Sequence, residues 1–143
     1  REAFFTDPEE AAYFVRETQV DSLAVAVGTA HGRYRGTPRL DFERLRRIHA
    51  LVNVPLVLHG SSGVPADAIR KAVACGICKV NIDTDIRQAF TDALRRTLAD
   101  MPDEIDPRKI LAPAREAATA VIREKIRLFG SAGRAKEFRE VEP

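Results

Sequence analysis

The segment VPLVLHGSSG, residues 54–63, decides the fold of this chain. Its first half is a short apolar run, which is typical of a strand buried on both faces of a parallel sheet. Its second half is a polar turn of glycine and serine that follows a histidine, His59. Because ligand groups of parallel α/β folds gather at the carboxyl ends of the strands, this segment predicts both a strand and part of a site.

Two further segments repeat the arrangement. Residues 22–28 form an apolar run that leads into the loop 29–39, which starts with Thr-Ala-His-Gly, and residues 78–81 form a third strand that leads into Asp-Thr-Asp. Three strands that alternate with helices predict right-handed crossovers and a parallel sheet, so the fold class is α/β.

Helices are predicted before the first strand and after every strand, from capping residues and from apolar residues at helical spacing. Their expected starts are Asp7-Pro8, Asp41, Pro65 and Asp83 or Thr84. Asp106-Pro107 is expected to begin a further turn, and Pro113 to restart a long helix that ends near Phe129. The charged tail from 134 to 143 is expected either to be poorly ordered or to dock on a partner subunit.

The composition excludes several classes of protein. Apolar residues make up 45% and charged residues 31%, as in ordinary soluble globular proteins. The net charge of +2 does not indicate a nucleic-acid partner. No apolar stretch approaches the about 18 residues of a membrane span, and the start of the chain lacks a signal-peptide core. We therefore expect a cytoplasmic protein without a membrane partner.

Cys75 and Cys78 have the spacing C-x-x-C. A zinc ribbon would need a second such pair, and a redox dithiol usually opens a helix, whereas here a predicted helix ends and a strand begins. We expect two buried thiols that pack as small apolar groups.

Two histidines follow neighbouring predicted strands, and each precedes a glycine. His31 and His59 would lie at strand ends about 4.8 Å apart, so both imidazoles could reach one metal at about 2.0–2.1 Å. His49 lies within a helical pattern and is expected to be structural. The turn 60–63 and the helix start at Asp83-Thr84 offer backbone N–H groups for an anion. Asn81 either orients a substrate oxygen or forms a turn.

The chain of 143 residues is short for a closed eight-stranded barrel, which needs about 250 residues. Three parallel strands alone leave sheet edges with unpaired backbone groups. The residues therefore permit either a small open three-stranded domain or a piece of a larger barrel.

The motifs at 27–32, 56–63 and 79–85, with Asp106-Pro-Arg and the segment 125–133, resemble class II fructose-bisphosphate and tagatose-bisphosphate aldolases. The resemblance covers nearly the whole chain. It implies the last three strands of a (β/α)8 barrel plus extra C-terminal helices, with 1–143 as the C-terminal part of a single aldolase domain. It also implies a homo-oligomer, a dimer or a tetramer.

The resemblance implies a zinc-dependent lyase that splits a ketose 1,6-bisphosphate, fructose before tagatose, into dihydroxyacetone phosphate and glyceraldehyde 3-phosphate. In it, His31 and His59 match two of three zinc ligands, although cobalt, iron or manganese would also suit imidazoles. A sodium or potassium ion would be held near Gly32 and Ser61. The positions that match substrate-binding residues are Gly32, Gly60, Ser61, Ser62, Asn81, Asp83 and Thr84.

In that mechanism zinc polarises the triose ketone and stabilises the enediolate, while acid/base groups move protons. The family's acid/base residues and third histidine match nothing in this chain, so no catalytic residue is assigned here. The N-terminal half of the same enzyme is the expected partner, with Arg1 just after a mobile loop. Two alternatives remain open: a non-catalytic phosphate-binding module on the same framework, and a fragment that mainly makes subunit contacts.

Overall fold

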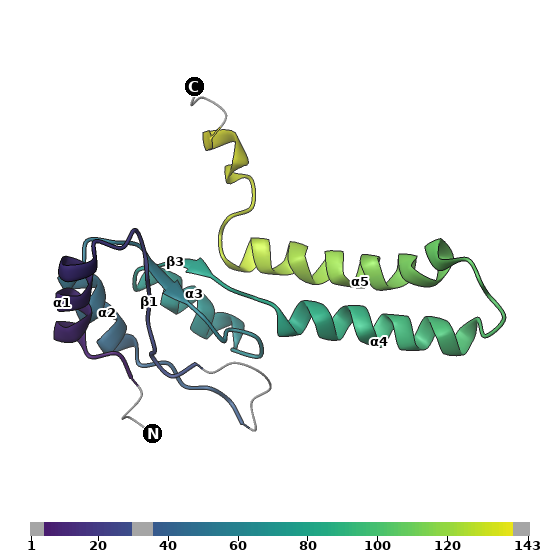
Figure 1. The fold of residues 1–143 in the computed structure, drawn as a ribbon, viewed down its shortest axis with the longest axis horizontal. Coiled ribbons are helices and arrows are strands. Elements are labelled where there is room, and N and C mark those ends of the chain that lie inside the picture. Colours follow the sequence, from purple (N-terminus) through teal and green to yellow (C-terminus); the bar gives the residue numbers. More distant parts are fainter. Residues whose placement is uncertain (1–4, 30–35, 139–143) are drawn as a thin grey trace. The chain divides into compact units, whose positions relative to one another are not determined.

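The structure is a computed structural model that describes residues 5–29 and 36–138. The chain divides into two compact units, Arg1–Ile82 and Asp83–Pro143, which are described separately below. Figure 1 labels most of the helices and strands of both units. No helix in the described parts of the chain is both long and apolar enough to cross a membrane.

The first unit contains a parallel three-stranded sheet. Its strands are β1 (Leu23–Ala24), β2 (Leu56–Leu58) and β3 (Ile77–Val80), and they lie in the order β1-β2-β3. The helices are α1 (Pro8–Thr18), α2 (Phe42–Leu51) and α3 (Ala66–Ala74). Helix α2 connects β1 to β2 and α3 connects β2 to β3, which confirms the predicted α/β class with parallel strands. The same sheet fits both a small open domain and a piece of a barrel.

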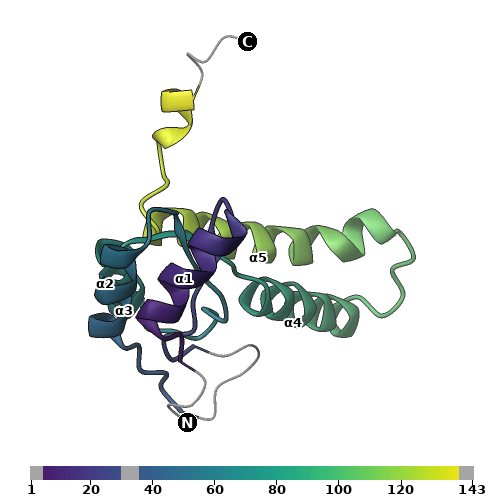
Figure 2. The same cartoon turned by 60° about the vertical axis from the view of Figure 1, so that its left-hand side comes forward.

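Local sequence explains where these helices begin. The Asp7 carboxylate accepts hydrogen bonds from the backbone N–H groups of Glu9 and Glu10, and Pro8 occupies the first turn of α1. Asp41 caps α2 in the same way through the N–H of Arg44. Pro65 is the cap residue of α3, so this helix begins at Ala66, one position after the predicted start. Helices α1 and α2 lie side by side in the first unit (Figure 2).

Strand β1 is shorter and more exposed than the sequence predicts. The predicted strand covered residues 22–28, buried on both faces, but only two residues form β1 and Ala24 is exposed. The Val25 N–H still donates to the Val57 carbonyl of β2 at 3.2 Å, but the backbone beyond Val25 bonds elsewhere. Ala26 exchanges hydrogen bonds with Thr6, and the Val27 carbonyl accepts from Asp41 N–H at 2.8 Å. These bonds replace the sheet ladder, so the extended segment continues without a strand partner.

The core of the first unit lies between the sheet and its helices. Side chains from α2, β2 and α3 meet there, and the largest fully buried ones are Leu45, Ile48, Leu56, Leu58 and Ile69. All three residues of β2 are buried, as predicted for the central strand of a parallel sheet.

The turn between α3 and β3 is a close packing point. Gly76 has φ +110°, and a Cβ atom there would collide with the ring of His49 on α2. His49 is therefore a helix residue that packs against a turn, as predicted. Cys75 is buried before this turn, but Cys78 is exposed on β3, so the prediction of two buried thiols is wrong. Cys78 lies on an edge strand of the described sheet, where no described neighbouring strand covers it.

The second unit is an antiparallel helical hairpin of α4 (Thr84–Asp100) and α5 (Pro107–Leu128). An ion pair of 2.8 Å joins Asp85, near the start of α4, to Lys125, near the end of α5. The buried Thr97 hydroxyl donates to the Ala93 carbonyl at 3.0 Å on its own helix. It thus needs no partner on the other helix.

Helix α5 runs without interruption through Pro113, so the predicted restart at this residue is wrong. An internal proline removes one helical hydrogen bond and typically costs about 3 kcal/mol. Ala114, the next residue, is fully buried. Packing against α4 therefore offsets the local preference of proline for a helix start.

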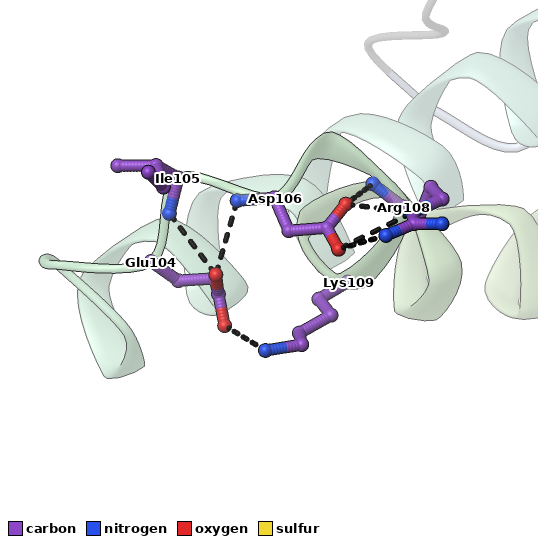
Figure 3. A network of polar contacts seen from close by, with 5 residues as sticks. All are labelled: Glu104, Ile105, Asp106, Arg108 and Lys109. Carbon is purple, nitrogen blue, oxygen red and sulfur yellow. Dashed lines mark hydrogen bonds and ion pairs between the residues drawn. The ribbon is translucent and has the colours of Figure 1, made fainter.

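The loop between α4 and α5 has its own polar network (Figure 3). The Glu104 carboxylate accepts from the N–H groups of Ile105 and Asp106 and from the Lys109 ammonium at 2.8 Å. Asp106 caps α5 by accepting from Arg108 N–H. The sequence predicted only a turn at Asp106-Pro107, but these residues begin the long helix α5 itself.

Helix α5 ends at a glycine, as its sequence predicts. Gly130 has φ +79°, and the N–H of Ser131 donates to the Ile126 carbonyl at 3.1 Å, which closes the helix end. A short 3-10 helix, η2 (Arg134–Phe138), follows within the predicted tail. Residues 139–143 of that tail lie outside the described residues.

Candidate functional site

The candidate site lies where strands β2 and β3 end. His59 directly follows β2 and Asn81 directly follows β3. Leu58 pairs with Val80 in the sheet register, and the Asn81 N–H donates to the Leu58 carbonyl at 3.0 Å. The ladder thus places His59 and Asn81 side by side. The Asn81 amide nitrogen lies 3.1 Å from His59 Nε2 and 3.4 Å from His59 Nδ1.

A tight glycine-serine turn follows His59. Gly60 and Gly63 have φ values of +64° and +79°, which residues with a Cβ atom rarely adopt. The Ser61 carbonyl accepts from Val64 N–H at 3.2 Å, which closes the turn before α3. Ser62 is buried as well, and unlike the Ser61 hydroxyl it is not without an interaction partner.

The Ser61 hydroxyl differs from the other polar groups of this turn. The residue is only 2% exposed, and its Oγ has no hydrogen-bond partner among the described residues. Leaving a buried hydroxyl unpaired typically costs about 1–3 kcal/mol. The Ser61 hydroxyl is therefore closed off from solvent in this structure.

The end of the β1 segment is held against the start of α2. Gly28 has φ +111°, and a Cβ atom there would collide with the carbonyl oxygen of Arg39. Asp41 N–H bonds to the Val27 carbonyl, as described above, while its carboxylate caps α2. The N–H of Arg44 and its guanidinium hold the pKa of Asp41 below its usual value, against the opposing effect of burial. Residues 27–28 and 39–41 thus lie close together.

His31 and Gly32 lie outside the described residues, which exclude 30–35. The predicted pairing of His31 with His59 therefore stays a prediction. Asp83 and Thr84 begin α4 in the second unit and are described with it. Asp83 occupies the cap position, but its carboxylate pairs with Arg87 at 2.8 Å and makes no capping hydrogen bond.

His59 fits the role of a metal ligand as far as one residue can. Its half-buried imidazole stands at the carboxyl end of a central strand, where catalytic groups of α/β folds gather. Within 5–29 and 36–138, no three His, Cys, Asp or Glu side chains are grouped closely enough to hold a metal ion. A site at His59 would therefore need ligands from outside these residues.

The contact between Asn81 and His59 is a feature that the sequence interpretation missed. Asn81 was assigned to a substrate oxygen or to a turn, and no partner was predicted for it. The available signal was that both residues directly follow neighbouring parallel strands. A polar pair at equivalent strand ends predicts such a contact once the register is known.

The sequence profile of a family described as "Fructose-bisphosphate aldolase class-II" matches residues 1–134. The chain belongs to this family. Among curated relatives, the fructose-bisphosphate aldolase of Thermus caldophilus is 46% identical over 94% of this chain. The family assignment agrees with the resemblance that the three strand-end motifs suggested.

Solved structures of aldolases share the fold. The YdjI aldolase from Escherichia coli K12 is 42% identical with a TM-score of 0.80, and it is matched by 92% of this chain. The fructose-bisphosphate aldolase of Campylobacter jejuni is 25% identical with a TM-score of 0.74 over 90% of this chain.

The chain spans about half the length of these relatives. The match covers 52% of the Thermus caldophilus protein, 48% of YdjI and 46% of the Campylobacter jejuni protein. The comparisons therefore show the family and the local α/β fold of this chain.

Proposed function

We propose that this chain contributes the last three strands and the extra C-terminal helices of a barrel that cleaves a ketose 1,6-bisphosphate. The products are dihydroxyacetone phosphate and glyceraldehyde 3-phosphate, and fructose 1,6-bisphosphate is the preferred substrate. One observation carries the proposal. In a chain of the class II aldolase family, His59, Asn81 and a glycine-serine turn lie together at the carboxyl ends of parallel strands.

The metal ligands from this chain are His59 and His31, and the remaining ligand comes from the rest of the enzyme. The metal is zinc, with cobalt, iron or manganese as substitutes that imidazole ligands also accept. A divalent metal bound there would polarise the ketone of the triose phosphate and stabilise the negative charge that develops on it. Acid/base groups outside this chain move the protons.

The turn after His59 binds the phosphate of the triose. Backbone N–H groups of a glycine-rich turn just before a helix make a good anion site. Gly32, Gly60 and Ser62 provide contacts, Ser62 through its hydroxyl. Ser61 contributes only its backbone N–H, because its hydroxyl is buried.

Three further contacts complete the proposed site. Asp83 and Thr84 donate backbone N–H groups from the start of α4, a helix end that favours an anion. A sodium or potassium ion binds carbonyl oxygens near Gly32 and Ser61. The Ser61 carbonyl accepts one bond, from Val64 N–H, and a carbonyl oxygen has a second lone pair.

The whole enzyme acts as a cytoplasmic homo-oligomer, a dimer or a tetramer.

The test compares His59→Ala with His49→Ala in the complete enzyme. Metal content is measured by elemental analysis, and cleavage of fructose 1,6-bisphosphate is measured by a coupled assay for the triose phosphates. His59→Ala should lose bound metal and turnover by more than the about 10–100-fold that loss of an outer-shell partner costs. His49→Ala removes an imidazole that packs on Gly76, so metal content should stay at the wild-type level.

Stoichiometric zinc and a near-normal rate in His59→Ala would remove His59 from the metal site. A wild-type enzyme that binds sugar phosphates but holds no divalent metal and cleaves no bisphosphate would support the phosphate-binding module instead. A chain that changes neither binding nor turnover when it is combined with the rest of the enzyme would support a role in subunit contacts.

A further inference from the structure

The contact between Asn81 and His59 is set by the backbone. Asn81 N–H bonds to the carbonyl of Leu58, the residue before His59, at 3.0 Å. The neighbouring pair Leu58 and Val80 is in register. The two residues occupy equivalent positions at the ends of neighbouring parallel strands. The hydrogen-bond ladder of the sheet, and not a flexible loop, therefore brings their side chains together.

The distances show how the amide meets the ring. Its nitrogen is 3.1 Å from Nε2 and 3.4 Å from Nδ1 of His59. A donor at nearly equal distances from both ring nitrogens cannot lie along the in-plane lone pair of either one, since these lone pairs diverge. The amide nitrogen therefore lies against the ring and off the lone-pair directions of both nitrogens. A group packed there limits the rotation of the ring by contact and leaves the lone-pair directions to other partners.

A metal ligand requires that kind of restraint. A ring nitrogen binds a metal along its lone pair, so a freely rotating imidazole loses conformational entropy when it binds. Neighbouring groups that orient a ligating histidine typically raise metal affinity about 10–100-fold. The side chain of Asn81 lies against both nitrogens of the His59 ring.

We propose that Asn81 is a positioning residue that orients the His59 imidazole for metal binding, before any substrate arrives. This inference rests on the proposed function, since it requires His59 to be a metal ligand. A positioning residue differs from a residue that contacts the substrate in one measurable respect. A residue that only touches the triose changes KM or kcat, whereas a positioning residue changes the affinity of the substrate-free enzyme for its metal.

The experiment uses Asn81→Ala in the complete enzyme, with Asn53→Ala as the matched control. Asn53 is an exposed asparagine in the segment between α2 and β2, away from the strand ends. The zinc dissociation constant is measured without substrate, by competition with a chromophoric chelator. Asn81→Ala should weaken zinc binding by about 10–100-fold, and Asn53→Ala should bind zinc as the wild type does.

A second readout is the visible absorption spectrum of the cobalt-substituted enzyme, which reports ligand geometry. Asn81→Ala should change this spectrum, and Asn53→Ala should not. Asn81→Ser provides a second variant in case the alanine protein does not fold. Its shorter polar side chain cannot reach the ring, so the same loss of zinc affinity is expected.

Unchanged zinc affinity and an unchanged cobalt spectrum in the folded Asn81 variants would overturn the inference, even if KM rose. A wild-type enzyme without a divalent metal would instead defeat the proposed function, whatever the Asn81 variants do. The two failures are therefore distinguishable.

Discussion

The substitution Gly76→Ala should destabilise the protein much more than an equivalent change at Gly130. Both glycines have positive φ values, +110° and +79°, so alanine should meet backbone strain of about 1–2 kcal/mol at each position. Only Gly76 adds a steric conflict, because its new Cβ would collide with the His49 ring, while no atom lies within 4 Å of a Cβ at Gly130. Overpacking typically costs about 1–3 kcal/mol more. We expect a total loss of about 2–5 kcal/mol for Gly76→Ala.

The assay is urea unfolding of the complete enzyme followed by circular dichroism, with the free energy of unfolding extrapolated to water. The double variant Gly76→Ala/His49→Ala separates the two contributions, because it keeps the strained backbone and removes the ring. The loss of unfolding free energy in the double variant should be about 1–3 kcal/mol smaller than the sum of the losses in the two single variants. Equal losses at Gly76 and Gly130, or no recovery in the double variant, would refute the argument that the turn before β3 packs on His49.

Two further predictions concern the site and the helix caps. Ser62→Ala should raise KM for the bisphosphate, whereas Ser61→Ala should change neither KM nor the free energy of unfolding for the worse, because the Ser61 hydroxyl is buried and makes no hydrogen bond among the described residues. Steady-state kinetics and urea unfolding measure both quantities. An equal rise in KM for the two variants would contradict the assignment. Asp41→Ala should lose about 1 kcal/mol of stability at neutral pH through the missing α2 cap, whereas Asp41→Asn keeps a capping oxygen. Because the pKa of Asp41 is lowered in the folded protein, chiefly by the Arg44 N–H, its charged form contributes stability above the unfolded value of about 4 and loses it as the pH falls through the folded pKa. The difference in unfolding free energy between the wild type and Asp41→Asn should therefore shrink as the pH is lowered. Unfolding curves at several pH values measure it, and a difference that stays constant would mean that the charge is unimportant.

Local signals predicted most of the elements. Aspartate and proline at helix starts, and glycine with positive φ at helix ends, act on neighbouring backbone groups and need no distant partner. The starts at Asp7, Asp41 and Asp106 were therefore predictable, as was the end at Gly130.

The errors arose where distant packing outweighed local preference. Helix α5 continues through Pro113 because its packing along α4 offsets the missing hydrogen bond. Strand β1 is short because Thr6 and Asp41 take the backbone bonds that a sheet ladder would otherwise make. Neither partner could be identified from the apolar run alone.

The sequence by itself determined the order of the elements, the family, and the presence of a histidine and a glycine-serine turn after the central strand. These depend on residue identity and on short-range backbone preferences. Only the tertiary structure decided that Asn81 lies against His59, that the Ser61 hydroxyl is buried and that Cys78 is exposed. These depend on strand register and on which neighbour covers each side chain, and both are set by contacts between residues far apart in the chain.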